Sequence, residues 1–209
     1  MLRMIQNILS LVIILFIVQS AYAGIDADLF AGLKARSIGP ATDSGRVTAI
    51  DVVESDVNTI YIGTAAGGVW KSVNAGLTWD PVFDKEDVAS IGALAINQSN
   101  PEILWVGTGE SNVRNSVSIG AGVFKSMDAG KTWDKVGLVD SEHITRIALN
   151  PIDPDVAYVA ALGKLWGPNS ERGIYKTVDG GKTWKKILYI NEDTGGGDIV
   201  MDRENPEKL

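Results

Sequence analysis

The octet "SMDAGKTW" occupies residues 126–133 and returns twice in closely similar form, as "SVNAGLTW" at 72–79 and "TVDGGKTW" at 177–184. The three copies follow one another at intervals of about 50 residues, which lies in the range of repeat architectures. An octet that recurs at a near-constant interval indicates that the chain is built from equivalent structural units. Each copy should therefore hold the same place in its unit.

Each octet lies among four short β-rich runs that come in the same order. In the second unit they are "SIGALAIN" (90–97), "ILWVGTG" (103–109), "GVFKS" (122–126) and "TWDKVG" (132–137). Their alternation and their content of Val, Ile and aromatic residues favour strands over helices. Tandem units of four antiparallel strands are typical of β-propeller blades. The sequence therefore predicts an all-β fold, a β-propeller of four-stranded blades with the octets as turns; a stacked solenoid is the competing architecture.

The repeats also predict how the propeller is distributed along the chain. A partial β-propeller is expected over 46–209, and its last residues, "NPEKL" at 205–209, match "NPEIL" at 100–104 in the second unit. Propellers close with about 4 to 8 blades, and an unclosed array leaves unpaired edges. We therefore expect an N-terminal fragment of about three and a half blades, with the rest supplied by C-terminal sequence; a partner chain that completes the ring is the alternative. The expected blades cover about 46–83, 90–137 and 144–188, and a fourth starts at 198–209.

The first residues, "MLRMIQNILSLVIILFIVQSAYA", have the features of a secretory signal peptide. A positive charge at Arg3 precedes an apolar stretch from Ile8 to Val18, and Ala21-Tyr22-Ala23 is a small-x-small cleavage pattern. The apolar stretch is too short to cross about 30 Å of hydrocarbon as a helix. The sequence therefore predicts a signal peptide at 1–23, a lead-in at 24–45 and an exported protein (periplasmic, cell-surface or secreted) without a membrane span after cleavage. An uncleaved N-terminal anchor is the alternative.

Composition narrows the classes of function. The chain has no cysteine, a net charge of −7 and no block of Lys and Arg. It therefore has no thiolate metal site, and nucleic acid is not an expected partner. We expect no cofactor and no metal, because phosphate-binding loops, zinc-ligand spacings and nucleophile elbows are absent from the sequence. The acidic residues Glu192, Asp193 and Asp198 lack the alternating spacing of a calcium loop and are interpreted as a solvated turn.

The letters of the octet each have a structural use in a turn. In the second copy, Asp128 is expected to accept hydrogen bonds from N–H groups two residues on, and Gly130 to take a positive φ. Trp133 offers a large apolar face with an N–H that needs a partner when buried. Because the first copy has Asn74 in place of the acid, proton chemistry is dispensable, and the octets are interpreted as scaffold rather than as catalytic or metal sites. The structural residues are Ser72, Asn74, Gly76, Trp79, Ser126, Asp128, Gly130, Trp133, Thr177, Asp179, Gly181 and Trp184.

The octet pattern resembles the Asp-box, or BNR repeat, of sialidases, xyloglucan hydrolases, Vps10/sortilin receptors and photosystem II assembly-factor-like propellers. Together with "RSIGP" (36–40), "GTAAGGVWKS" (63–72) and "DSEHITRIALNP" (140–151), it makes the chain similar to exported bacterial proteins of the sortilin N-terminal or glycosyl-hydrolase-like type. The resemblance implies a propeller over nearly the whole chain after the signal peptide. In the xyloglucan-hydrolase branch an Asp precedes the Gly-Gly of the first blade, and the matching position here is Ala65. The Arg-Ile-Pro motif of sialidases is absent.

Function is expected on the face opposite the octets, in the loops between the second and third strands of each blade. Two of these loops, 109–122 and 163–173, are long, and long loops on a repetitive scaffold tend to carry function. A Trp beside polar side chains suits stacking on a sugar ring or a peptide side chain. An alternative interpretation makes the charged residues inter-blade salt bridges and loop ties, and the single histidine structural. The candidate ligand-binding residues are Glu110, Asn112, Arg114, Trp166, Glu171, Arg172 and His143.

The sequence predicts an exported β-propeller that acts as a binding or interaction module for a peptide, protein or glycan. The alternative is a glycoside hydrolase of xyloglucanase or sialidase type whose catalytic residues lie partly outside this chain. Its two carboxylates would lie about 5 to 10 Å apart, and Glu110 with Glu171 or Asp193 is a conceivable pair. A structural module that supports assembly of other exported proteins is a third hypothesis. No catalytic residue is assigned, and whether the protein is an enzyme stays open.

Overall fold

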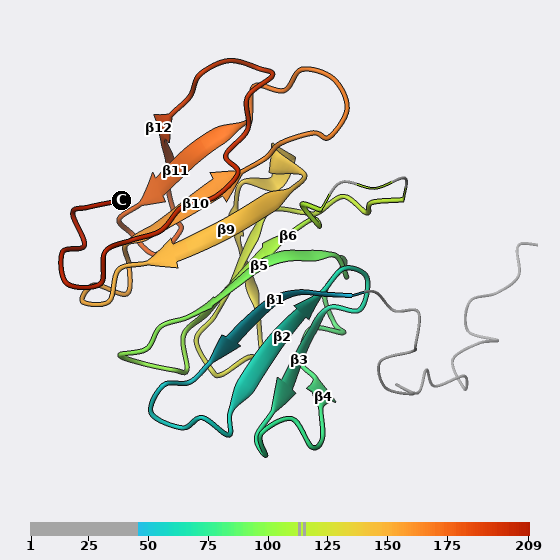
Figure 1. Cartoon of the computed structure of the whole chain (residues 1–209), viewed down its shortest axis with the longest axis vertical. Coiled ribbons are helices and arrows are strands. Elements are labelled where there is room, and N and C mark those ends of the chain that lie inside the picture. Colours follow the sequence, from blue (N-terminus) through green and yellow to red (C-terminus); the bar gives the residue numbers. More distant parts are fainter. Residues whose placement is uncertain (1–45, 113, 115) are drawn as a thin grey trace, which may run out of the picture. The chain divides into compact units, whose positions relative to one another are not determined.

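The computed structural model describes residues 46–112, 114 and 116–209 (Figure 1). The expected signal peptide and lead-in lie outside the described residues. The described part is all-β: three four-stranded antiparallel sheets and one 3-10 turn, η2 (Val139–Ser141). No helix among these residues has the length and apolar character needed to cross a membrane. The predicted all-β fold is confirmed, and four antiparallel strands per unit fit a partial β-propeller.

Each sheet is a meander in which the four strands pair in chain order. The octet of each unit connects the third strand to the fourth. The first blade consists of β1 (Val47–Val52), β2 (Ile60–Thr64), β3 (Val69–Ser72) and β4 (Asp80–Pro81); the second of β5 (Ile91–Ile96), β6 (Leu104–Thr108), β7 (Val123–Ser126) and β8 (Asp134–Gly137); the third of β9 (Ile144–Leu149), β10 (Ala157–Ala161), β11 (Gly173–Thr177) and β12 (Lys185–Leu188).

The first strands of the blades, β1, β5 and β9, are neighbours in space (Figure 1). Glycines in the second strands allow this close approach. A Cβ atom at Gly63 in β2 would overlap the side chain of Ile91 in β5, and a Cβ atom at Gly107 in β6 would overlap Ile144 in β9. Each branched side chain of a first strand thus fills the space that a glycine of the preceding blade leaves open.

The hydrophobic core lies between successive blades, in two clusters of buried side chains. Between the first and second blades, the ring of Phe83 meets the rings of Phe124 and Trp133 edge-on, with centroids 5.2 Å apart in both pairs. Between the second and third blades, the buried ring of Trp105 meets Trp184 at 6.2 Å and 90°. Such edge-to-face pairs add to the burial of apolar area, so each blade is stabilised chiefly by its neighbours.

The octet turn is closed by its first and third residues. The hydroxyl oxygen of Ser126 accepts hydrogen bonds from the N–H groups of Asp128 (3.3 Å) and Gly130 (2.9 Å). The carboxylate of Asp128 accepts from the N–H and the hydroxyl of Thr132, at 2.9 and 2.7 Å. The prediction that the acid bonds the N–H two residues on is wrong, because that N–H bonds Ser126 instead. Positive φ angles at Ala129 (59°) and Gly130 (85°) turn the chain so that Thr132 reaches the carboxylate.

The copy with Asn74 keeps the same geometry without the charge. Asn74 Oδ1 accepts from the N–H of Thr78 at 2.9 Å, and its amide nitrogen donates to the Thr78 hydroxyl at 2.8 Å. In the other copies, hydrogen bonds from the threonine lower the pKa of Asp128 and of Asp179 to about 2. A carboxylate with this pKa stays ionised near neutral pH and accepts hydrogen bonds within the turn.

The tryptophan of the octet joins its blade to the preceding one. The indole Nε1 of Trp133 donates to the backbone carbonyl of Val82 at 2.7 Å, and that of Trp184 donates to the carbonyl of Val136 at 2.7 Å. Within the described residues, the indole of Trp79 has no acceptor, since the first blade has no predecessor among them. The octet is thus both a turn and an inter-blade contact.

Candidate functional site

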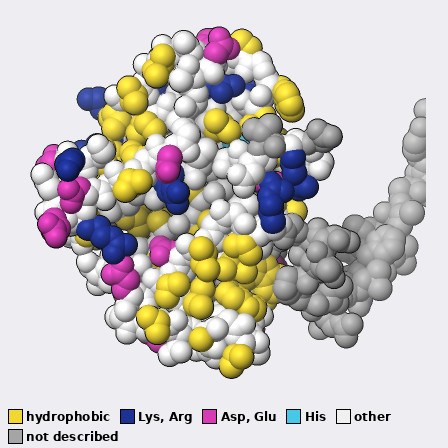
Figure 2. All heavy atoms as spheres, viewed as in Figure 1, with side chains coloured by type: hydrophobic (Ala, Val, Ile, Leu, Met, Phe, Trp, Pro, Cys, Tyr) yellow, Lys and Arg dark blue, Asp and Glu magenta, His cyan; other side chains and the backbone are white. Residues whose placement is uncertain are grey.

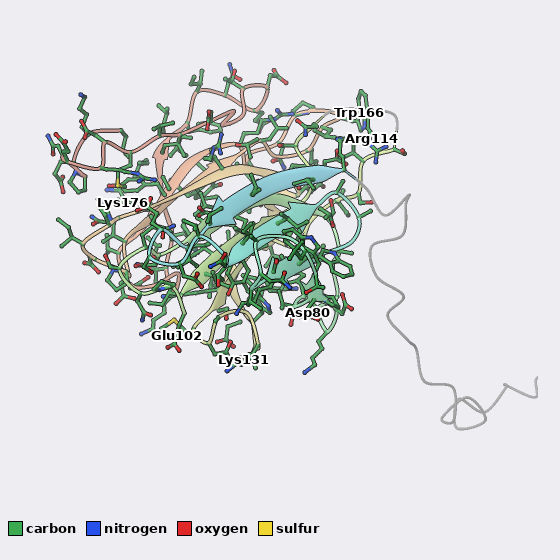
Figure 3. The ribbon with its side chains drawn as sticks, turned by 60° about the horizontal axis from the view of Figure 1, so that its bottom comes forward. Asp80, Glu102, Arg114, Lys131, Trp166 and Lys176 are labelled. Atoms are coloured by element: carbon green, nitrogen blue, oxygen red, sulfur yellow. The ribbon has the colours of Figure 1, made fainter. Side chains whose placement is uncertain are left out.

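The loops between second and third strands lie at the strand ends opposite the octets. Figure 3 shows Arg114 and Trp166, from two of these loops, at one end of the molecule, and Glu102 and Lys131 at the other end. The 109–122 loop is held to the following inter-blade link, because the N–H of Gly120 donates to the carbonyl of Glu142 at 2.7 Å. The candidate residues therefore gather at one end of the strands.

Glu110 is the centre of a charged cluster in the 109–122 loop. Its side chain is only 1% exposed, and it forms ion pairs with Arg46 and with Arg114, the latter at 3.6 Å. Its N–H donates to the hydroxyl of Ser90 at 2.9 Å, while Arg46 also donates to the carbonyl of Asn112 at 3.3 Å. The guanidinium-bearing side chains stay 40% and 45% exposed. Glu110 is therefore not a free carboxylate, because it is paired with two arginines that face solvent. Figure 2 shows basic side chains gathered near the start of β1.

Arg46 was not among the sequence candidates, although it ties the first blade to the loop of the second. It stands directly before β1, and no motif marks it. The ion pair with Glu110 joins two blades, as the alternative interpretation of the loop charges expects. Because the contact spans two repeats, local sequence patterns carry no signal for it.

The 163–173 loop is held by two of its own charged residues. Arg172, buried to 9% exposure, donates to the carbonyls of Lys164 (2.6 Å) and Gly167 (3.2 Å). The carboxylate of Glu171 accepts from the hydroxyl of Tyr175 at 3.0 Å. Burial and this carboxylate raise the pKa of Tyr175. These contacts fix the loop backbone and leave Glu171 hydrogen-bonded within the blade.

Trp166 is the exposed member of the same loop. Its side chain is 76% exposed, more than other tryptophans of the described chain, which are buried or half-buried. It lies between Lys164 and Gly167, the two residues whose carbonyls Arg172 binds. A large aromatic ring on a braced loop costs little ordering entropy when it binds a ligand.

His143 is placed inside the molecule, in the link between the second and third blades. It is 1% exposed, and its Nδ1 lies 3.0 Å from the carbonyl oxygen of Gly163. Because a carbonyl only accepts, Nδ1 carries the proton and donates. Nε2 is buried without a partner among the described residues, and burial lowers the pKa of His143. The neutral imidazole thus ties the link to the start of the 163–173 loop.

A second concave region lies at the octet end of the first strands, where no candidate was predicted. A cavity of about 420 Å³ is lined by the ends of β1, β5 and β9 and by residues 199–203. Arg203 pairs with Glu54 at 2.6 Å and Arg146 with Asp198 at 2.8 Å, while burial raises the pKa of Asp51. The signal available in the sequence was one charged residue in each of two mostly apolar strands, Asp51 in β1 and Arg146 in β9.

No protein-family model matches the chain. Two curated proteins are similar over part of it. The vacuolar protein sorting/targeting protein 10 of Kluyveromyces lactis is 35% identical over 74 residues, which is 35% of this chain and 4% of that protein. The protein of the same name from Sordaria macrospora is 32% identical over 91 residues, 43% of this chain and 5% of that protein. The similarity is therefore confined to a short part of much longer proteins.

Solved structures of enzymes share the fold. A GH74 enzyme of Niastella koreensis aligns with a TM-score of 0.52 and 23% identity, over 67% of this chain and 21% of that one. An ancestral GH74 enzyme aligns with a TM-score of 0.51 and 22% identity, over 69% of this chain and 18% of that one. The chain thus spans about a fifth of these structures, and the likeness concerns the fold alone. The three sheets are blades of a β-propeller, and the chain has partial similarity to a vacuolar sorting protein.

Proposed function

We propose that the chain is part of an exported β-propeller that acts as a binding module for a peptide, protein or glycan. The observation that carries the proposal is Trp166, 76% exposed on a loop that the buried Arg172 braces. At the same end of the strands, Arg46 and Arg114 form ion pairs with Glu110 and are 40% and 45% exposed. An aromatic ring and guanidinium groups at the same end of the strands can offer a ligand stacking and charged hydrogen bonds.

The partial similarity to proteins named for vacuolar protein sorting and targeting supports a binding role, because sorting requires recognition of another protein. In this proposal the octets are Asp-box, or BNR, repeats that serve as scaffold. The protein is exported by the signal peptide at 1–23, and nucleic acid is not a partner. The ligand face is formed by the 109–122 and 163–173 loops.

A glycoside hydrolase remains the alternative function, favoured by the likeness of the fold to GH74 enzymes. Three observations favour the binding module over it. Glu110 is buried between two arginines, Glu171 accepts a hydrogen bond from Tyr175, and the position matched to a catalytic acid is the buried Ala65. Retaining and inverting mechanisms need two accessible carboxylates about 5 to 10 Å apart.

The proposal is tested by screening the chain on glycan and peptide arrays and comparing it with Trp166→Ala. The matched control is Ile152→Ala, which removes a 79% exposed side chain at the octet end of the third blade. We expect ligands of the unaltered chain to be retained by the control and weakened at least about tenfold by Trp166→Ala, or about 1.4 kcal/mol. Ligands that bind both variants equally would contradict the proposal. Release of sugars from xyloglucan or sialosides would instead support the hydrolase.

A further inference from the structure

The cavity at the octet end of the first strands has the size and the lining of a site for a small molecule. Its volume is about 420 Å³, and small-molecule sites usually measure about 300 to 1,000 Å³. The first strands β1, β5 and β9 are neighbours (Figure 1), and their ends form the wall together with residues 199–203. Aliphatic side chains predominate in the lining, among them those of Ala95, Ile96, Ile147, Leu149, Ile199 and Val200.

Four charged residues line the cavity, and three of them have an ion-pair partner. Arg203 and Glu54 pair with each other at 2.6 Å, and both side chains are exposed. Arg146 pairs through Nε with the carboxylate of Asp198 at 2.8 Å. Each arginine therefore already has a carboxylate beside it, and an exposed pair of this kind leaves little net charge toward the cavity.

Asp51 is the fourth charged residue, and it forms no ion pair with any residue that the structure describes. It lies near the end of β1 and is half-buried. Its carboxylate oxygens accept hydrogen bonds from the N–H of Val52 at 2.9 Å and from the N–H of Ile96, in β5, at 2.8 Å. Burial raises the pKa of Asp51, while Arg203 and Glu54 shift that pKa in opposite directions. The cavity thus contains a carboxylate whose charge is poorly compensated.

The surroundings of Asp51 indicate which kind of ligand would compensate its charge. Each carboxylate oxygen accepts one backbone N–H and keeps a second acceptor position. A cation that donates to these positions forms charge-assisted hydrogen bonds, which are strong where the carboxylate is shielded from water. A metal ion needs more ligands than Asp51 supplies, and residues 46–112, 114 and 116–209 contain no group of three or more His, Asp and Glu side chains able to hold one. The aliphatic lining instead suits a ligand with an apolar body.

We propose that this cavity binds a small organic cation, a primary ammonium group on an apolar body. The ammonium donates to the carboxylate of Asp51, and the apolar body lies against the aliphatic lining. An organic anion is disfavoured, because it would have to replace a carboxylate already paired with an arginine and would lie near the charge of Asp51. The cavity lies at the strand ends opposite Trp166, so this inference does not depend on the proposed ligand face.

The test uses the unaltered chain and three probes that share a phenyl group: phenethylamine, phenethyl alcohol and phenylacetate. Binding is followed by NMR at the amides of Val52 and Ile96, whose N–H groups bond the Asp51 carboxylate. We expect phenethylamine to shift both signals at millimolar concentration. Phenethyl alcohol should bind at least about tenfold more weakly, because it brings no charge to Asp51. Equal affinities for the amine and the alcohol, tighter binding of phenylacetate, or no shift with the amine would overturn the proposal.

Asp51→Asn removes the charge and keeps one oxygen that can accept a backbone N–H. It should weaken phenethylamine at least about tenfold and leave the affinity for phenethyl alcohol unchanged. The matched control is Asp84→Asn, which removes the same charge from an exposed residue of the first blade outside the cavity. Amine affinity that is equal in the two variants would contradict the role of Asp51.

Two further variants keep the test decisive if Asp51→Asn fails to fold. Val200→Ser alters an exposed residue of the lining and should also weaken phenethylamine, because apolar contact is lost. Trp166→Ala should leave the amine affinity unchanged, which separates this cavity from the proposed ligand face. Amine binding that Trp166→Ala abolishes and Val200→Ser leaves intact would place the amine at the loops and overturn the proposal.

Discussion

The indole nitrogen of Trp133 donates a hydrogen bond to the backbone carbonyl of Val82, at 2.7 Å and across the junction of the first two blades. The same bond joins Trp184 to Val136 at the next junction. The last residue of the octet therefore forms a hydrogen bond between blades, while the first and third residues form hydrogen bonds within the turn. The copies that end in Trp133 and Trp184 therefore perform both tasks.

Trp133→Phe should destabilise the protein by about 1 kcal/mol, because the carbonyl of Val82 loses its donor while most of the apolar contact remains. The matched control is Trp79→Phe, which removes an indole N–H that has no acceptor among the described residues. Urea unfolding followed by circular dichroism measures both. Equal losses of stability in the two variants would contradict the inter-blade role of the indole.

Asp128→Asn should leave the stability nearly unchanged, because Asn74 supports the same turn in the first octet. Asp128→Ala should cost about 1 kcal/mol or more, since the N–H and the hydroxyl of Thr132 both lose their acceptor. Thermal unfolding of the two variants separates the hydrogen-bond role from the charge. If Asp128→Asn lowered the thermal stability as much as Asp128→Ala, the prediction would be contradicted, and the negative charge itself would stabilise the turn.

The octet acids should also make the protein sensitive to acid. The pKa of Asp128 and of Asp179 is lowered to about 2 in the folded state, so the unfolded chain binds the proton more readily. Their contribution to stability is complete above the usual carboxyl pKa near 4 and is lost as the pH falls toward 2. The double variant Asp128→Asn, Asp179→Asn should show a weaker fall in Tm between pH 4 and 2. An unchanged acid profile would contradict this assignment.

His143 should give a second pH dependence at higher pH. Burial lowers its pKa below the usual 6.5, so protonation favours the unfolded chain. Stability is therefore full above pH 6.5 and falls as the pH drops below that value. His143→Gln should be less stable at pH 7.5 but should lack the fall between pH 7 and 5. A fall of the same size in the variant would assign the effect to other groups.

Gly107→Ala should destabilise the protein by about 1 to 3 kcal/mol, because the added Cβ overlaps the side chain of Ile144 across the blade junction. Gly197→Ala is the matched control, since a Cβ there meets nothing within 4 Å. Chemical denaturation compares the two. A Gly107→Ala protein as stable as the control would show that the junction adapts to the extra methyl group.

Much of the scaffold was predictable from the sequence, and the reason lies in the local chemistry of the repeat. The octet with its turn residues marks the connection between third and fourth strands, and the β-rich runs around it mark the strands. The contacts between blades were not predictable in the same way. Trp133 with Val82, and Arg46 with Glu110, join residues of different units, and nothing in the sequence near one member points to the other.

The candidate site, like the scaffold, was predictable from the sequence only in part. Trp166 was singled out by its residue type and by the length of its loop, and the structure shows that it is exposed; its contact with a ligand stays a prediction. The burial of Glu110 and His143 depends on groups that arrive from neighbouring segments, so residue type alone did not separate a free side chain from a buried one.

The central claim is that the octets are scaffold and that ligands bind at the opposite loops. The most direct measurement compares Asp128→Asn with Trp166→Ala on the ligands retained by the unaltered chain in the glycan and peptide arrays. Asp128→Asn should bind with unchanged affinity, and Trp166→Ala should lose about tenfold or more. Loss of binding in Asp128→Asn with full binding in Trp166→Ala would contradict the account and move the site to the octets.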